Sequence, residues 1–229
     1  MESKKEALKH YEDEIENALL SLELSGQLNK ALAVYCTVEK GIEAVESSPG
    51  DPFYVEKQRV LAYCLMRQVN ILLQQGQLEE ALALSERELT AACASGDEVT
   101  LGRGLMSHGS TCIVNGNTKE GMTFIEKARP YFERGTTYDH AQGLGWYWIL
   151  KADLQNAEMI PGNPSDVIHA CDTALDILMP IKNWPGVARA YAARAHAYEK
   201  LGNHEKAAAD RNAQSEYEKI ASEEGIGSP

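Results

Sequence analysis

The hydrophobic residues of this chain recur every three or four positions through most of its length, in segments that end at glycine, proline or polar residues. This spacing predicts amphipathic helices, because a half-buried strand would instead alternate hydrophobic and polar residues. The stretches SSPGDP, SGD, RGTT and NWPG separate longer helical regions, and glycine and proline are strong helix breakers. The sequence therefore predicts an all-α protein.

A short pattern recurs inside the helical regions, and SGQLNKALAV, QQGQLEEALAL, NGNTKEGM and LGNHEKAA are four versions of it. Each version has a glycine followed five residues later by a small residue: Gly26 and Ala31, Gly76 and Ala81, Gly116 and Gly121, Gly202 and Ala207. Successive glycines lie 50, 40 and 86 residues apart. Because 86 is about two periods, we expect a degenerate copy near SDVIHACDTAL and hence five repeats.

Each repeat is predicted to be a helical hairpin. Glycine suits the left-handed backbone that ends a helix, and the small residue one turn into the second helix lets the two helices approach closely. A single hairpin cannot bury its hydrophobic face alone, so neighbouring hairpins must stack. We expect a single solenoid domain over 1–229 with about ten helices, a flexible tail at 222–229, and repeats at about 7–48, 53–95, 98–134, 138–181 and 185–221.

The repeats resemble the tetratricopeptide repeat (TPR) over about residues 7–221. The last copy matches with Tyr191, Ala195, Tyr198, Gly202 and Ala207, and the third with Leu105, Gly109, Gly116 and Gly121. The second copy departs at Val69, and the fourth departs at Trp148 if Leu144 is its leading apolar residue. The roughly 40-residue units resemble the arrays attached to bacterial regulators and signalling proteins. The resemblance implies a right-handed α-solenoid.

In a TPR-like superhelix, the residues of the first helix that do not pack on the second line the concave face. Arginine side chains there would pair with carboxylates, and an aromatic side chain would anchor an apolar group. The alternative is that the arginines are solvated and the tryptophan belongs to the core. The residues expected on this face are Tyr63, Arg67, Asn70, Arg103, Ser107, Ser110, Gln142, Trp146, Ile149, Arg189 and His196, and Asp13, Glu16 and Asn17 make its first end acidic.

Charge and cysteine content restrict the partners and the compartment. Lysine and arginine number 22 against 34 aspartates and glutamates, and the net charge of −12 disfavours nucleic acid and membrane surfaces. No apolar run approaches the roughly 18 residues that span a bilayer. Five cysteines, an odd number without a CxxC motif, favour a reducing cytoplasm in which the thiols are core side chains.

The candidate catalytic and metal-binding patterns have simpler structural interpretations. His108 and Cys112 share a helical face, but two ligands do not make a site, and core packing is favoured. GRG at 102–104 and GLG at 143–145 lack the surroundings of a phosphate cradle and are expected to allow close helix contact. No nucleophile-elbow motif is present. We therefore expect no enzyme activity, no metal and no cofactor.

The expected function is that of a non-catalytic scaffold or adaptor, which binds a protein or peptide with acidic or carboxylate groups in the concave face. One alternative is a regulatory sensor that closes around a small molecule or signalling peptide, and a third is an enzyme with a pocket in the same face. QNAEMIPGNPSD, residues 155–166, is interpreted as a tolerated surface insertion or a binding loop. The last helix, with AAADRNAQSEYEKI, suits a cap or a weak homodimer contact.

Overall fold

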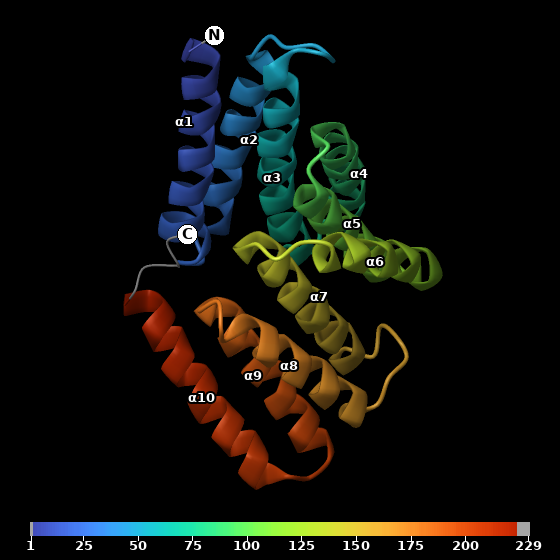
Figure 1. The fold of residues 1–229 in the computed structure, drawn as a ribbon. Helices are drawn as coiled ribbons and strands as arrows, with labels where there is room; N and C mark the ends of the chain where they lie inside the picture. The colour runs from blue at the N-terminus through green and yellow to red at the C-terminus, as the bar shows by residue number, and fades with distance from the viewer. Residues whose placement is uncertain (1, 224–229) are drawn as a thin grey trace. The chain divides into compact units, whose positions relative to one another are not determined.

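The computed structural model describes residues 2–223, and within this range it contains helices and turns but no strand (Figure 1). The expected all-α class with about ten helices is confirmed. Residues 224–229 of the expected tail lie outside the described residues. The elements are α1 (Glu2–Ala18), the π-helical turn η1 (Leu19–Glu23), α2 (Leu28–Ala44), α3 (Pro52–Gln74), α4 (Leu78–Ser95), α5 (Glu98–Val114), α6 (Thr118–Glu133), α7 (Tyr138–Asn156), α8 (Pro164–Leu178), α9 (Trp184–Lys200) and α10 (His204–Glu223).

The ten helices form five successive pairs, and we call the first helix of each pair the A helix and the second the B helix. Within pairs, α3 packs against α4, α7 against α8 and α9 against α10. Neighbouring A helices also touch, since α3 contacts both α1 and α5, and α7 contacts α9. Within each unit, one A helix therefore packs next to the following A helix.

The four recurring glycines build the same turn four times. Gly26, Gly76, Gly116 and Gly202 have φ angles of 77°, 72°, 91° and 72°, in the left-handed region that favours glycine. Each glycine N–H donates to the carbonyl three residues earlier, and the next N–H donates to the carbonyl five residues earlier. This arrangement satisfies the last carbonyls of the A helix, as the sequence pattern predicts.

The fourth turn has the same hydrogen bonds without a glycine. Glu158, with φ 57°, donates its N–H to Gln155 O at 3.0 Å, and Met159 N–H donates to Leu154 O at 2.9 Å. Glu158 is therefore the equivalent of Gly116 and Gly202. The expected register of the fourth repeat, based on Leu144 as leading residue, is wrong by three positions, because the left-handed residue carries no glycine signal.

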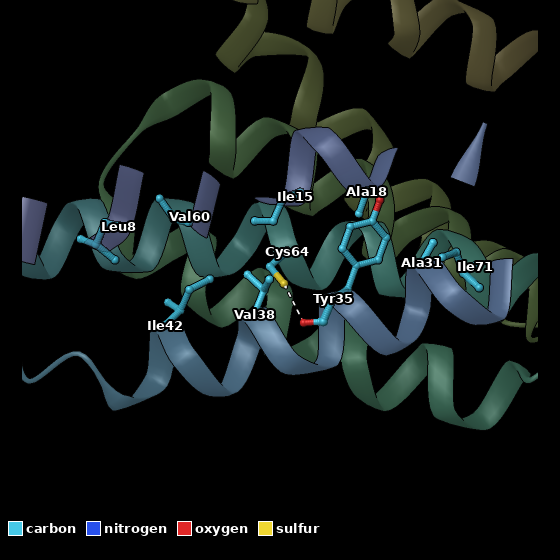
Figure 2. Close-up of a cluster of buried hydrophobic side chains, with 10 residues drawn as sticks. All are labelled: Leu8, Ile15, Ala18, Ala31, Tyr35, Val38, Ile42, Val60, Cys64 and Ile71. Carbon is cyan, nitrogen blue, oxygen red and sulfur yellow. Dashed lines mark hydrogen bonds between the residues drawn. The ribbon is translucent and has the colours of Figure 1, made fainter. Parts of the chain in front are cut away.

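The chain divides into two compact units, Met1–Lys127 and Ala128–Pro229, and a single solenoid domain stays a prediction. In unit 1, Leu8, Ile15, Tyr35 and Ile42 belong to one cluster of buried side chains from α1, α2 and α3 (Figure 2). Its thiol Cys64 donates to Tyr35 O at 3.3 Å. Unit 2 has its own clusters, formed by residues of α7, α8 and α9.

Small residues allow close helix contact, as the sequence pattern predicts. A Cβ built on Gly109 of α5 would lie 2.7 Å from Gly121 O of α6, so any larger side chain would push the pair apart. The GRG and GLG stretches behave alike. A Cβ on Gly104 would lie 2.9 Å from the Cβ of Ala92, and one on Gly145 would lie 2.4 Å from Leu178.

Candidate functional site

The candidate site is the side of the A helices that does not pack on the B helices. In unit 1 the expected residues stand thirteen, nine and six positions before the turn glycines of α3 and α5. All six are half-buried. The residues are Tyr63, Arg67 and Asn70 on α3, and Arg103, Ser107 and Ser110 on α5. Ser107 is described separately below. The other five residues form what we call the A-helix face of unit 1: Tyr63, Arg67, Asn70, Arg103 and Ser110.

Arg67 is held by an acid of its own chain. Its Nε donates to Glu23 Oε2 at 3.1 Å and its terminal nitrogen donates to Glu23 Oε1, so both carboxylate oxygens are engaged. Tyr35 Oη donates to Glu23 Oε2 at 2.8 Å. Burial, followed by this hydrogen bond to Glu23, raises the pKa of Tyr35, which stays protonated as the donor. The side chains of Arg67 and Glu23 are 15% and 7% exposed.

Two more side chains of α3 bind acids of α1 in the same way. Tyr63 Oη donates to Glu16 Oε1 at 2.7 Å, and Arg59 donates to Glu12 Oε1 at 2.8 Å. Glu16 belongs to the end of the face that was expected to be acidic, and its carboxylate accepts this hydrogen bond from a neutral hydroxyl. The sequence reasoning missed Arg59 and Glu23. The spacing of four residues along α3 from Arg59 to Tyr63 to Arg67 was the available signal.

Ser107 does not face the exposed side, which corrects the expectation. Its Oγ donates to Glu88 Oε2 of the B helix α4 at 2.6 Å. Glu88 is 1% exposed, and burial raises its pKa well above the ordinary value of 4.5, against the smaller opposing effect of the Ser107 hydrogen bond. Ser110 Oγ donates to its own helix at Ser107 O (2.9 Å), and Arg103 has an interaction within the chain.

His108 and Cys112 lie in the core, as predicted. His108 Nδ1 is 2.9 Å from Ser85 Oγ and its Nε2 is 3.5 Å from Cys112 Sγ, while its ring meets the Phe124 ring edge-on at 4.7 Å. Burial lowers the pKa of His108, which favours the neutral ring. Over residues 2–223, no three His, Cys, Asp or Glu side chains are grouped to hold a metal ion.

Unit 2 places its candidate residues differently. Ile149 is 1% exposed and belongs to the core between α7, α8 and α9, so its expected exposed position is wrong. Trp146, expected on the concave face, is half-buried against the same core, and its neighbour Tyr147 is fully buried. Gln142 is half-buried and has an interaction within the chain.

Arg189 also has an acidic partner in its own unit. Its Nε lies 3.0 Å from Asp153 Oδ2 of the neighbouring A helix. Burial raises the pKa of Asp153, and the nearby Arg189 partly opposes that shift. Arg189 remains 56% exposed, in contrast to Arg67. His196, which lies on the same helix α9 and was also expected on the concave face, is exposed.

The insertion in repeat 4 surrounds a pocket of about 620 Å³. Met159, Ile160 and Val167 contribute apolar wall. Asn156 Nδ2 donates to Ala193 O at 2.9 Å, while its Oδ1 is buried without a hydrogen-bond partner among the described residues. Lys200 Nζ donates to Asn156 O at 2.8 Å and lies 3.2 Å from Glu158 Oε1. These bonds fix the loop between α7 and α8.

No helix in the described part of the chain is both long and apolar enough to cross a membrane. Neither a family model nor a curated protein matches the sequence. Solved structures do match. The crystal structure of BtubC (BKLC) from P. vanneervenii is 12% identical with a TM-score of 0.57, and the match covers 99% of this chain and 94% of that one.

Two further structures complete the comparison. The apo form of RapI is 12% identical with a TM-score of 0.56 over 96% of this chain, which spans 66% of RapI. A putative kinesin light chain from Podosopora anserina with nearly identical TPR-like repeats is 13% identical with a TM-score of 0.46, over 98% of this chain and 96% of that one. The five helix pairs and their shared turns, together with the two higher-scoring matches, show the fold of a TPR-type helical repeat solenoid.

Proposed function

We propose that this chain is a non-catalytic scaffold that binds another protein or a peptide across the A-helix face of unit 1. The observation that carries the proposal is the contrast between the two sides of α3 and α5. Val60, Cys64 and Ile71 of α3 are fully buried, whereas the residues of the A-helix face are polar and half-buried. A row of preorganised helices that presents half-shielded polar groups suits the binding of an extended segment.

Asn70 is the central residue of the proposed site. Its amide carries both a donor and an acceptor, which matches the N–H and C=O of a peptide group. Arg103 would add a cation that attracts an acidic or carboxylate group of the partner. Tyr63 contributes an aromatic ring whose hydroxyl is already bound to Glu16.

The proposal includes a cytoplasmic location. All five cysteines are free, and burial raises the pKa of Cys64 and Cys171 to about 12, so these two remain thiols. Buried, protonated thiols are poor nucleophiles, and they pack as small core side chains. Unpaired cysteines of this kind are typical of a reducing compartment.

Affinity purification from the native cell, followed by mass spectrometry, tests the scaffold. We compare the tagged wild type with Asn70→Ala/Arg103→Glu, and use Arg211→Glu on α10, where the arginine is 60% exposed, as the control for charge reversal. The wild type and the control should retain the same partner, and the double variant should lose it while melting at a similar temperature. A wild type that retains no second protein, or a double variant that retains the same one, contradicts the proposal.

A further inference from the structure

Arg67 already binds a carboxylate of its own chain in the two-point geometry with which arginine recognises carboxylates. A guanidinium binds a carboxylate through two parallel N–H groups. In this structure Nε and the terminal nitrogen of Arg67 both donate to Glu23, one to each oxygen. A partner's carboxylate would have to displace Glu23 to use these two N–H groups, and Glu23 already balances the charge of Arg67.

The Glu23 carboxylate is positioned by groups other than Arg67. Tyr35 Oη donates to it from α2, and the π-helical turn η1 brings it against α3. Its side chain is only 7% exposed, although Leu20 and Leu24 on either side are 43% and 58% exposed. The side chain of Glu23 therefore points into the protein although its neighbours in the turn are exposed, and it contacts Arg67 of the A-helix face.

We propose that Glu23 is a specificity-determining residue, an internal carboxylate that neutralises Arg67 and so closes this position of the A-helix face to acidic groups of a partner. The proposal rests on the proposed function of this face. Arg59, another arginine of α3, is also engaged by acids, Glu12 and Glu56. At the Arg67 position the partner would present an uncharged group.

The chain offers a matched control for the charge. Glu43 also pairs with an arginine, Arg87 at 2.9 Å, but on the B-helix side, where both side chains are 49% exposed. Glu43→Gln and Glu23→Gln change the net charge equally. Only Glu23→Gln leaves an arginine of the A-helix face without its carboxylate.

Binding of fluorescein-labelled hexaglutamate, measured by fluorescence anisotropy at low salt, tests the inference, with hexalysine as the opposite charge. We expect Glu23→Gln to bind hexaglutamate at least about tenfold more tightly than wild type and Glu43→Gln, a change of about 1.4 kcal/mol. In Glu23→Gln/Arg67→Met the gain should disappear. This double variant also restores neutrality at the buried position, so it separates the effect of the exposed Arg67 charge from the loss of the Glu23 carboxylate itself.

An equal gain in Glu43→Gln would show a general charge effect and overturn the inference. So would a gain that persists in the double variant, or no gain in a folded Glu23→Gln. If Glu23→Gln does not fold, hexaglutamate affinity of Glu23→Asp, whose shorter carboxylate weakens the fork, must exceed that of wild type, and no increase there overturns the inference. The purification experiment with Asn70 and Arg103 can still succeed in each case, which separates this failure from failure of the scaffold.

Discussion

Two glutamates buried in unit 1 are accommodated in opposite ways. Glu23 lies between α2 and α3 with the guanidinium of Arg67 and the hydroxyl of Tyr35, whereas Glu88 of α4 has the hydroxyl of Ser107. A buried carboxylate is stable as an ion when a cation and hydrogen bonds compensate it, and otherwise it takes up a proton. The first interface therefore holds a charge pair, and the second holds a carboxyl group whose pKa is raised by burial.

The difference teaches where charge matters in this repeat array. Glu23 of η1 pairs with Arg67 of α3, which is itself a residue of the proposed binding face. Glu88 lies in the contact between α4 and α5, which belong to neighbouring hairpins, and its raised pKa makes that contact sensitive to pH. Four substitutions test this comparison, in descending order of expected effect.

Arg67→Met should have the largest effect on stability. Removing the cation leaves the Glu23 carboxylate buried and unpaired, so the free energy of unfolding should fall by about 3–5 kcal/mol in urea denaturation at pH 7. Arg59→Met is the control, because Arg59 is more exposed at 32% and should cost about 1 kcal/mol or less. Equal losses in the two variants would contradict the distinction between a buried and a surface pair.

Glu88→Gln should stabilise the protein, and increasingly so at higher pH. The folded pKa of Glu88 lies above its ordinary 4.5, so between these two pKa values the folded state binds more protons than the unfolded state. The glutamate's contribution to stability is thus fully present below pH 4.5 and is lost as pH rises, by up to about 1.4 kcal/mol per pH unit. Glutamine has no such loss, and we expect a gain of about 1–3 kcal/mol at pH 8.

Unfolding of wild type and Glu88→Gln from pH 5 to pH 8 checks this expectation. The difference between the two proteins isolates Glu88, because His108, whose lowered pKa acts in the opposite sense, titrates in both. A difference that stays constant with pH, or a glutamine variant less stable at pH 8, would show that Glu88 is ionised in the folded protein.

Ser107→Ala should cost about 1 kcal/mol, the contribution of one buried hydrogen bond to Glu88. Ser110→Ala is matched to it on the same helix, since its hydroxyl bonds to the backbone of α5, and it should be nearly neutral. Thermal unfolding at pH 6 measures both. The interpretation fails if alanine at 110 costs as much as alanine at 107.

Arg189→Met should have the smallest effect, about 0.5 kcal/mol or less, because its pair with Asp153 is largely exposed. The small loss should also shrink in 0.5 M salt, which screens exposed pairs. A loss comparable to that of Arg67→Met would mean that the exposure of the arginine does not decide the strength of these pairs.

Much of the fold could be predicted because small residues and turns leave local signals. A glycine and, five positions later, a small residue recur in every well-matched repeat, as Gly76 and Ala81 do in the second. The turn is possible because glycine has no side chain, and the close helix contact is possible because the second residue has a small one. The same logic placed His108 and Cys112 in the core. It failed at Glu158, which adopts the left-handed turn without the residue type that usually marks it.

The candidate site could be predicted only in part. Helical periodicity placed Tyr63, Arg67 and Asn70 on the half-buried side of α3, but it misplaced Ser107, which reaches back to α4, and Ile149, which the packing of α9 helps to bury. The error of three positions in the fourth repeat does not account for Ile149, because Ile149 stands nine positions before Glu158 and so keeps a face position in the corrected register. Its burial comes from packing against other helices, which periodicity within one helix does not record.

By itself, the sequence determined that the chain forms paired helices with tight turns, because periodicity, glycine and small side chains act through neighbours a few residues apart. Only the tertiary structure decided which charges are satisfied. Glu23 and Arg67 lie 44 residues apart in the chain, and Glu88 and Ser107 lie 19 apart. Whether a carboxylate meets a guanidinium or a hydroxyl depends on how helices from different hairpins pack. The hydrophobic pattern within one helix does not predict such a contact.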